Sequence, residues 1–256
     1  MTKFEVAQFP ARSDNFAVIV HDPASGATAA IDAPDADPII ATLKARGWTL
    51  SHILVTHKHF DHIEGIPALQ EAYECEVIGP EMSLTETGMY DRTVKGGDKV
   101  PWAGEEISVF ATPGHTLDHI TYWFPENKLV FAADLIFSLG CGRVIEGDHA
   151  MMWNSIKTIR DLPDDTALYC GHEYTLANGK FALTVEPGNV VLKKRVEEVE
   201  KLRAEDKPTL PTTIGAEKAA NPFLRADHPA LMRAVGMAGG DPAKVFAEVR
   251  TRKDKF

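Results

Sequence analysis

Four potential metal ligands lie within six residues of this chain, at His57, His59, Asp61 and His62. They follow residues 50–56, an apolar stretch that is typical of a buried β-strand. In an extended stretch, residues i and i+2 project to the same side, so His57 and His59 can grip one cation. Asp61 and His62 come where the chain must turn, which lets them face a second cation beside the first.

Three further candidate ligands, His115, Asp134 and His172, each come directly after a β-like run. Taken singly, each would more often be a turn or hydrogen-bonding residue, but all seven together provide five imidazoles and two carboxylates. Such ligands suit zinc first, with iron and manganese as alternatives, at roughly 2.0–2.2 Å. Two ions ~3.5–4 Å apart, sharing one carboxylate, would leave room for a bridging solvent and lower its pKa from about 15.7 toward ~7. The pattern therefore predicts a two-metal hydrolase with a bridging hydroxide.

The remaining ionisable residues give weaker signals. His52, His119, His149 and His228 lie outside the strand-end pattern, and we assign them no role. Asp32, at the end of an early predicted strand, could orient a ligand histidine from behind. A capping or turn role for Asp32 is equally consistent with the sequence.

The amino-acid composition excludes several classes of protein. The chain has 256 residues, of which 44% are hydrophobic and 25% charged, as in ordinary globular domains. Its net charge of −10 disfavours binding to nucleic acid or to anionic membranes. No apolar run reaches the ~20 residues of a membrane span, and the start has no signal-peptide pattern. Three widely spaced cysteines form neither a disulfide framework nor a zinc motif, so we expect a reduced, cytoplasmic protein. No obvious interface stripe is present, so we expect a monomer.

Strands and helices interleave along the first ~180 residues, which indicates the α/β class. Tight hairpins favour a mixed sheet or two sheets over a doubly wound parallel sheet. We expect helices over residues 36–46, which Gly47 would end, and over residues 151–162. After residue 184 the composition shifts, and residues 190–205 predict a charged amphipathic helix. The expected domains are therefore a metal domain over residues 1–184 and a helical, substrate-binding domain over residues 185–256.

The ligand pattern resembles that of the metallo-β-lactamase superfamily in order, spacing and strand-end setting. This resemblance implies an αββα sandwich of two mixed sheets, with helices outside and the metals at one edge. It implies that each metal has three ligands of its own and that the two share a bridging carboxylate. It assigns His57, His59 and His115 to one metal, Asp61, His62 and His172 to the other, and Asp134 to the bridge. Asp61 and Asp134 would be the catalytic carboxylates.

Within that superfamily the chain is similar to glyoxalase II, the hydroxyacylglutathione hydrolases, along essentially its whole length. The stretches that carry the likeness are residues 56–62, 111–116, 140–143 with 146–147, 169–175, 185–189, 221–223 and 249–254. The last three separate this family from other superfamily members and extend into the helical domain.

The family resemblance also implies the residues that hold the glutathione moiety. These are Arg143, His172, Tyr174, Arg250 and Lys253. The family often has lysine in place of Arg143 and tyrosine in place of Ile145, so affinity for glutathione could differ here. Without the family pattern, Arg250 and Lys253 would be interpreted as a solvated basic tail, whereas a cationic spot on an acidic protein suits the anionic glutathione.

The resemblance implies a thioester hydrolase, EC 3.1.2.6, that converts S-D-lactoylglutathione to D-lactate and glutathione in methylglyoxal detoxification. A glutathione persulfide dioxygenase with a single iron is the alternative, and the intact second ligand set speaks against it. A nuclease is disfavoured by the net charge, and a lactamase by the missing signal peptide. A closed structural metal site is disfavoured because such sites are usually rich in cysteine.

Overall fold

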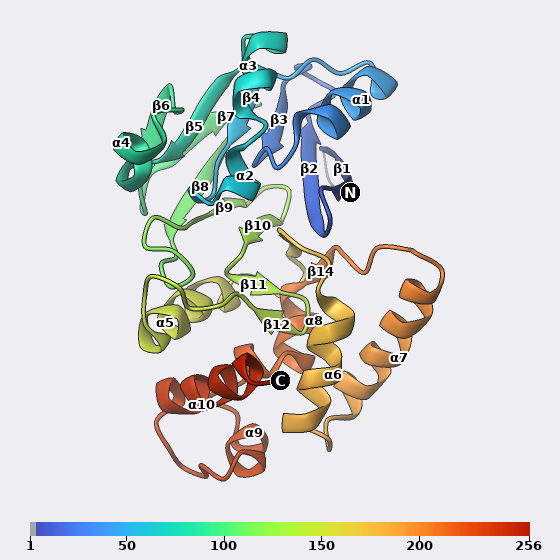
Figure 1. The fold of residues 1–256 in the computed structure, drawn as a ribbon, viewed down its shortest axis with the longest axis vertical. Coiled ribbons are helices and arrows are strands. Elements are labelled where there is room, and N and C mark those ends of the chain that lie inside the picture. The colour runs from blue at the N-terminus through green and yellow to red at the C-terminus, as the bar shows by residue number, and fades with distance from the viewer. Residues whose placement is uncertain (1–3) are drawn as a thin grey trace. The chain divides into compact units, whose positions relative to one another are not determined.

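The computed structural model describes residues 4–256 and contains two compact units (Figure 1). The first unit comprises residues 4–112 and 116–131, and the second comprises residues 113–115 and 132–256. The predicted α/β class, with two mixed sheets and a helical C-terminal region, is confirmed. The division into domains after residue 184 stays a prediction.

The first sheet has six strands in the order β1-β2-β3-β4-β5-β6. They are β1 Glu5–Ala11, β2 Asn15–His21, β3 Thr28–Ile31, β4 His52–Leu54, β5 Glu76–Pro80 and β6 Arg92–Val94. The first three strands are antiparallel, and β3 to β6 run parallel to their neighbours. Because the carboxyl ends of β3 and β4 lie at the same edge, Asp32 and Thr56 come close together there. Strand β1 was not predicted, because Pro10 interrupts its pattern.

The first unit also contains several helices. They are α1 Ala36–Arg46, α2 Phe60–Ile63, α3 Ile66–Tyr73 and α4 Leu84–Thr87, with a 3₁₀ turn η1 Glu81–Ser83. The predicted helix over residues 36–46 is confirmed: Asp35 accepts a capping hydrogen bond from Asp37 N, and Gly47 ends the helix at a φ of 68°. Ile39 of α1 and Leu69 of α3 are fully buried in one cluster with the sheet residues. This packing anchors α1 and α3 to the first sheet.

The second sheet has the order β14-β13-β10-β9-β8-β7. Its strands are β7 Lys99–Trp102, β8 Glu105–Ala111, β9 Ile120–Phe124, β10 Leu129–Ala133, β13 Ala167–Cys170 and β14 Thr212–Thr213. Within the first unit, Tyr122 of β9 reaches the first sheet, where its hydroxyl donates to the Val55 carbonyl at 2.9 Å. Complete burial raises the pKa of Tyr122 well above its usual value. Two sheets therefore face each other inside this unit.

The second unit contains a short hairpin and most of the helices. The elements are β11 Ile136–Phe137, β12 Gly140–Cys141, α5 His149–Arg160, α6 Thr175–Val185, α7 Val190–Ala204, α8 Ile214–Ala220, η2 Pro222–Leu224, α9 Pro229–Ala234 and α10 Pro242–Asp254. Helix α6 was not predicted, since Gly179 weakens its helical pattern. A Cβ at Gly179 would lie 2.8 Å from Val196 Cγ2, so this glycine lets α6 and α7 approach closely.

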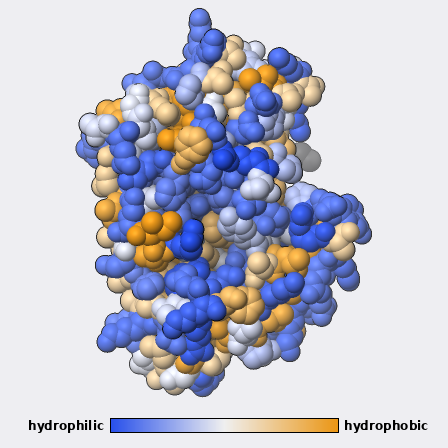
Figure 2. Space-filling view, viewed as in Figure 1, coloured by the Kyte–Doolittle hydropathy of each residue, from blue (hydrophilic) through white to orange (hydrophobic). Residues whose placement is uncertain are grey.

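None of the helices in residues 4–256 has the length and apolar character that crossing a bilayer requires. Figure 2 shows a face dominated by hydrophilic residues, with hydrophobic ones scattered among them. The three cysteines, Cys75, Cys141 and Cys170, are all buried and unbridged. Burial raises the pKa of the Cys141 thiol to about 11, so this thiol stays protonated at neutral pH.

Candidate metal centre

The first unit gathers its predicted ligands in the loop and short helix that follow β4. His57 is fully buried, and its ring centroid lies 4.8 Å from that of His59 and 4.2 Å from that of His62. Possible ligand atoms of Asp32, His57 and His62 all lie within 4.8 Å of one another. The three predicted histidines of this segment thus form one cluster.

Asp32 lies behind this cluster and orients it. One of its carboxylate oxygens accepts from Thr56 N at 2.7 Å, and the other contacts Thr56 Oγ1 and His62 Nδ1, each at 2.8 Å. With Nδ1 of His62 bonded to Asp32, Nε2 is the nitrogen that can bind a metal. Asp32 adopts the left-handed backbone region at a φ of 58°, which aspartate tolerates better than most residues. Of the two roles that the sequence left open for Asp32, the contact with His62 Nδ1 fits the orientation of a candidate ligand histidine.

Asp61 lies in the single turn of α2, and Asn15 of β2 holds it in place by hydrogen bonds. Asn15 Nδ2 donates to both the main-chain oxygen and Oδ2 of Asp61, each at 3.1 Å. Asp61 Oδ2 lies 3.8 Å from His62 Nε2. The carboxylate and the imidazole therefore present neighbouring ligand atoms, as expected for two ligands of one ion.

The second unit brings its three predicted ligands together around one carboxylate. Asp134 Oδ2 lies 3.3 Å from His115 Nε2 and 3.4 Å from His172 Nε2. Asp134 directly follows β10 and His172 follows β13, and these strands are neighbours in the second sheet. The carboxyl ends of the two strands thus place Asp134 and His172 side by side.

The ring of His115 is oriented by the main chain of the loop after β12. His115 Nδ1 lies 2.8 Å from the carbonyl oxygen of Arg143, which again leaves Nε2 as the nitrogen that can bind a metal. Gly142 makes this approach possible, because a Cβ there would overlap the Asp134 carbonyl oxygen and come within 3.3 Å of His115 Nδ1. The second glycine of the Gly-Cys-Gly segment, Gly142, is therefore required because a side chain would not fit there.

The predicted substrate-binding residues all belong to the second unit. The ring of Tyr174 stacks on that of His172, with centroids 4.8 Å apart and planes 2° from parallel. Arg143 is exposed, at the loop whose carbonyl orients His115. Tyr174 therefore lies against the candidate ligand His172, and Arg143 lies at the loop that contacts the candidate ligand His115.

Arg250 and Lys253 differ in their surroundings. Arg250 is only 4% exposed, and its guanidinium donates to the Cys141 carbonyl at 3.0 Å and pairs with Asp254 at 2.8 Å. Lys253 is half-buried, with Nζ 5.3 Å from the centroid of the Phe181 ring. Partial burial and the positive charge of Arg250 lower the pKa of Lys253. Lys253 is therefore the more accessible cation of the pair.

The histidines without an assigned role have ordinary partners. His52 Nε2 lies 3.5 Å from Glu76, and burial lowers the pKa of His52. His119 Nδ1 lies 2.9 Å from Thr112 Oγ1, inside the first unit. His228 caps α9 by accepting from Ala230 N.

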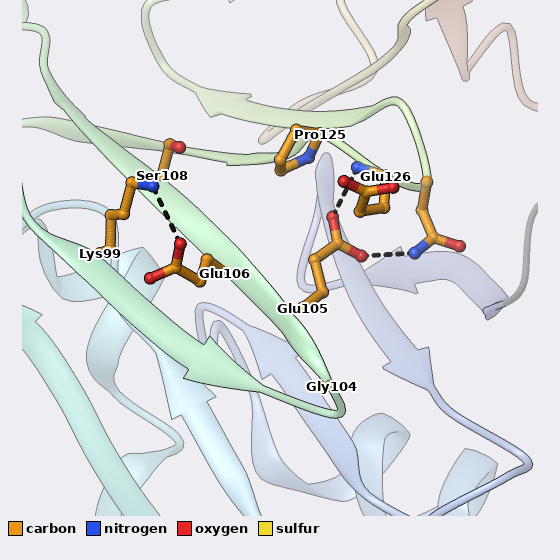
Figure 3. A pocket seen from close by; sticks show the side chains of 8 residues that line it. Lys99, Gly104, Glu105, Glu106, Ser108, Pro125 and Glu126 are labelled. Carbon is orange, nitrogen blue, oxygen red and sulfur yellow. Dashed lines mark hydrogen bonds and ion pairs between the residues drawn. The ribbon is translucent and has the colours of Figure 1, made fainter.

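Figure 3 shows a surface pocket of the first unit that is lined by charged and turn residues. Glu105 accepts from Asn127 Nδ2 at 2.5 Å and from Glu126 N at 2.9 Å, which ties the β9–β10 turn to β8. Lys99 pairs with Glu106 at 2.9 Å. These interactions hold strands and a turn together, and we assign the pocket no chemical role.

The donor chemistry of both units fits divalent cations. Each set combines imidazole nitrogens with carboxylate oxygens and contains no thiolate, which suits zinc, iron or manganese. In each set the rear nitrogen of one histidine, His62 or His115, is bonded to an oxygen of the protein, the arrangement that orients metal ligands. The His/Asp clusters are typical of a binuclear metal site.

Comparison with protein families defines the class of this protein. Residues 12–172 match the model of the metallo-beta-lactamase superfamily. The crystal structure of BLEG-1 B3 metallo-beta-lactamase superposes with a TM-score of 0.67, at 23% identity, covering 86% of this chain and 99% of that one. ETHE1 from Myxococcus xanthus superposes with a TM-score of 0.66, at 24% identity, covering 98% of this chain and 97% of that one. These likenesses show a metallo-β-lactamase fold.

The C-terminal region narrows the class to one family. Residues 173–256 match the model described as hydroxyacylglutathione hydrolase C-terminus. The hydroxyacylglutathione hydrolase of Nitrobacter hamburgensis is 55% identical over 98% of both chains. That of Rhodopseudomonas palustris strain BisB5 is 52% identical over 96% of both. The chain belongs to the hydroxyacylglutathione hydrolase family, the glyoxalase II enzymes of class EC 3.1.2.6, as the sequence motifs predicted.

Proposed function

We propose that this protein hydrolyses S-(2-hydroxyacyl)glutathione thioesters, with S-D-lactoylglutathione as its substrate and D-lactate and glutathione as products. Membership of the family supports the reaction. The observation that carries the proposal is the placement of Asp134 between His115 and His172, because it puts a bridging-type carboxylate among metal-binding imidazoles.

We propose that the protein binds two divalent cations, with zinc as the first candidate metal. The proposed set joins the imidazole and carboxylate groups already described. One ion would take His57, His59 and His115, the other Asp61, His62 and His172, and Asp134 would bridge them. When bound, the ions would supply hydroxide at neutral pH and polarise the thioester carbonyl.

The protein's own residues orient this chemistry. Asn15 holds Asp61, Asp32 holds His62, and the Arg143 carbonyl holds His115. Asp61 and Asp134 are the proposed catalytic carboxylates, since both would ligate metal and Asp61 would also orient the attacking hydroxide. A thiol has a pKa near ~8.5, so the departing glutathione thiolate needs no general acid.

We propose that the glutathione moiety binds to the second unit. The proposed contacts are Arg143, His172, Tyr174, Arg250 and Lys253. Glutathione is a net anion with two carboxylates, and exposed Arg143 and half-buried Lys253 supply matching positive charge. Arg250 lies one turn earlier in α10, where it adds a second positive charge and donates to the Cys141 carbonyl. The cytoplasmic location and the monomeric state stay predictions from the sequence.

A hydrolysis assay tests the proposed function. We expect S-D-lactoylglutathione to be hydrolysed, activity to fall to background after chelation, and zinc to restore it. Metal analysis should give two equivalents per chain. Oxygen uptake with glutathione persulfide is the parallel assay. Oxygen uptake without thioester hydrolysis would instead establish the single-iron dioxygenase.

Replacing Lys253 with glutamine is expected to raise KM for the thioester about fivefold with little change in kcat, because a charge that binds ground and transition state alike is lost. Steady-state kinetics at several salt concentrations measure this change. Lys255→Gln is the matched control, since Lys255 is exposed two residues further along the chain. An unaltered KM in Lys253→Gln would remove Lys253 from the proposed glutathione site.

A further inference from the structure

The β11–β12 hairpin links two parts of the proposed metal site in the second unit. It begins one residue after Leu135, which itself follows Asp134, and its two strands pair Ile136 with Cys141 and Phe137 with Gly140. At the base of the hairpin, Gly142 N donates a hydrogen bond to the Leu135 carbonyl oxygen at 3.3 Å. The next residue, Arg143, supplies the carbonyl that orients His115. The base of the hairpin therefore sets the position of one ligand and the orientation of another.

The tip of the hairpin has an unfavourable backbone conformation. Leu139 adopts a φ of 57°, in the left-handed region that leucine rarely occupies. Its side chain is fully buried in a cluster with Ala182, Leu192 and Val196 of the helices. Such a conformation persists only where the surroundings hold it in place.

Glu217 of α8 supplies the hydrogen bonds that hold this tip. It is 1% exposed, and one carboxylate oxygen accepts from Leu139 N at 2.8 Å. The other oxygen lies 3.0 Å from Ser138 Oγ and 2.8 Å from Thr212 Oγ1. Burial raises the pKa of Glu217, while the hydrogen bonds that it accepts lower it. Both residues of the turn are thus bonded to a single buried carboxylate.

Asn221 completes the contact, one helical turn after Glu217. Asn221 is fully buried, and its Nδ2 donates to the carbonyl oxygens of Phe137 at 3.1 Å and Gly140 at 2.9 Å. The same nitrogen lies 2.9 Å from Glu217 Oε2. Glu217 and Asn221 together satisfy polar groups on both strands and on the turn between them.

We propose that Glu217 and Asn221 are positioning residues for the metal ligands Asp134 and His115, acting through the β11–β12 hairpin. This inference rests on the proposed function, because it takes those two side chains to be metal ligands. Neither residue touches the ligands directly. Their effect passes through a strained turn, the short paired strands and the base at Gly142. The helical C-terminal region would thereby tune metal binding as well as substrate binding.

Three variants test this proposal in the full chain. Glu217→Ala and Asn221→Ala are expected to weaken zinc binding about tenfold, the lower end of the effect of removing groups that orient ligands. Competition with a chromophoric chelator measures this affinity. Hydrogen exchange of the Leu139 amide in the metal-free protein should accelerate in both variants. Glu217→Gln should behave nearly as wild type, since its amide can donate to the Ser138 and Thr212 hydroxyls while its oxygen accepts from Leu139 N.

Asn189→Ala is the matched control. Asn189 caps α7 and donates to the Ala219 carbonyl at 3.0 Å in the same helical region, but it has no hydrogen bond to the hairpin. Asn189→Ala should lower the midpoint temperature of thermal unfolding without changing the zinc affinity. If Glu217→Ala does not fold, Asn221→Ala and Glu217→Gln decide between the outcomes.

Two results would overturn the proposal. One is a zinc affinity of Asn221→Ala equal to that of the wild type. The other is a wild-type exchange rate of the Leu139 amide in metal-free Glu217→Ala or Asn221→Ala. Tenfold weaker zinc binding by Glu217→Gln would also overturn it. A failure of the proposed function is a different result, since the wild-type protein would then bind no zinc and hydrolyse no thioester. Leu139 exchange in the metal-free variants would still report whether Glu217 holds the hairpin.

Discussion

Asp134→Ala is expected to abolish thioester hydrolysis, with kcat/KM at least ~10³-fold lower, or about 4 kcal/mol of transition-state stabilisation. The reason is that one Asp134 oxygen lies within 3.4 Å of Nε2 of both His115 and His172, so the substitution removes the proposed bridging ligand. Bound zinc should fall from two equivalents to one or fewer. Steady-state kinetics and metal analysis of the same preparation measure both effects.

Asp164→Ala serves as the control for Asp134→Ala. The Asp164 side chain is 73% exposed and pairs with Lys218 at 2.6 Å. Asp164→Ala therefore removes one negative charge, as Asp134→Ala does, without removing a proposed ligand. Both variants should unfold at the wild-type temperature once metal is removed. Full activity with two zinc equivalents in Asp134→Ala would contradict the bridging role.

Two substitutions of Asp32 are expected to separate folding from metal binding in the first unit. Asp32→Ala should destabilise the metal-free protein by ~3 kcal/mol or more, because it leaves buried donors of Thr56 and His62 without their acceptor. It also places alanine at a φ of 58°, where alanine is strained. Urea unfolding of the chelated protein measures the free energy of unfolding.

Asp32→Asn should fold well but bind zinc ~10- to 100-fold more weakly. Asparagine tolerates the left-handed backbone and still accepts from Thr56 N. Its amide nitrogen, however, would donate to His62 Nδ1, which moves the imidazole proton to the nitrogen proposed to bind metal. Chelator competition measures the affinity, and the NMR tautomer of His62 reports the cause.

Asp22→Ala is the companion control for Asp32→Ala. Asp22 is a buried carboxylate that accepts from Ala24 N and Ser25 N in a turn of the same unit. Asp22→Ala should lower the free energy of unfolding and leave the zinc affinity unchanged. Equal zinc affinity in Asp32→Asn and wild type would show that Asp32 does not orient a ligand.

The candidate ligands of this protein could be identified from the sequence because metal sites use few residue types at fixed positions relative to strands. Residues 56–62 place three histidines and a carboxylate after a buried strand, and each unit gathers its own predicted set. The superfamily followed from the ligand motifs and the family from three further stretches in the helical region, and the family is confirmed over nearly the whole chain. Helix α1 was readable for a similar reason, since its cap residues and Gly47 are local signals.

The sequence left the role of Asp32 open between two alternatives and gave no signal for Glu217, because supporting roles depend on contacts between residues far apart in the sequence. Asp32 acts on His62, 30 residues later, through the parallel pairing of β3 and β4. Glu217 acts on Leu139, 78 residues earlier. The sequence around Glu217 has no motif that distinguishes it from a solvated helical glutamate.

The amino-acid sequence by itself determined the ligand types, the reaction class and the alternation of strands and helices, because each depends on local residue type and spacing. Only the tertiary structure decided which carboxylates stand behind the ligands and that Arg250 is buried against Cys141 rather than solvated in a basic tail. Burial and long-range hydrogen bonds depend on which segments pack together, and no single stretch of sequence contains that information.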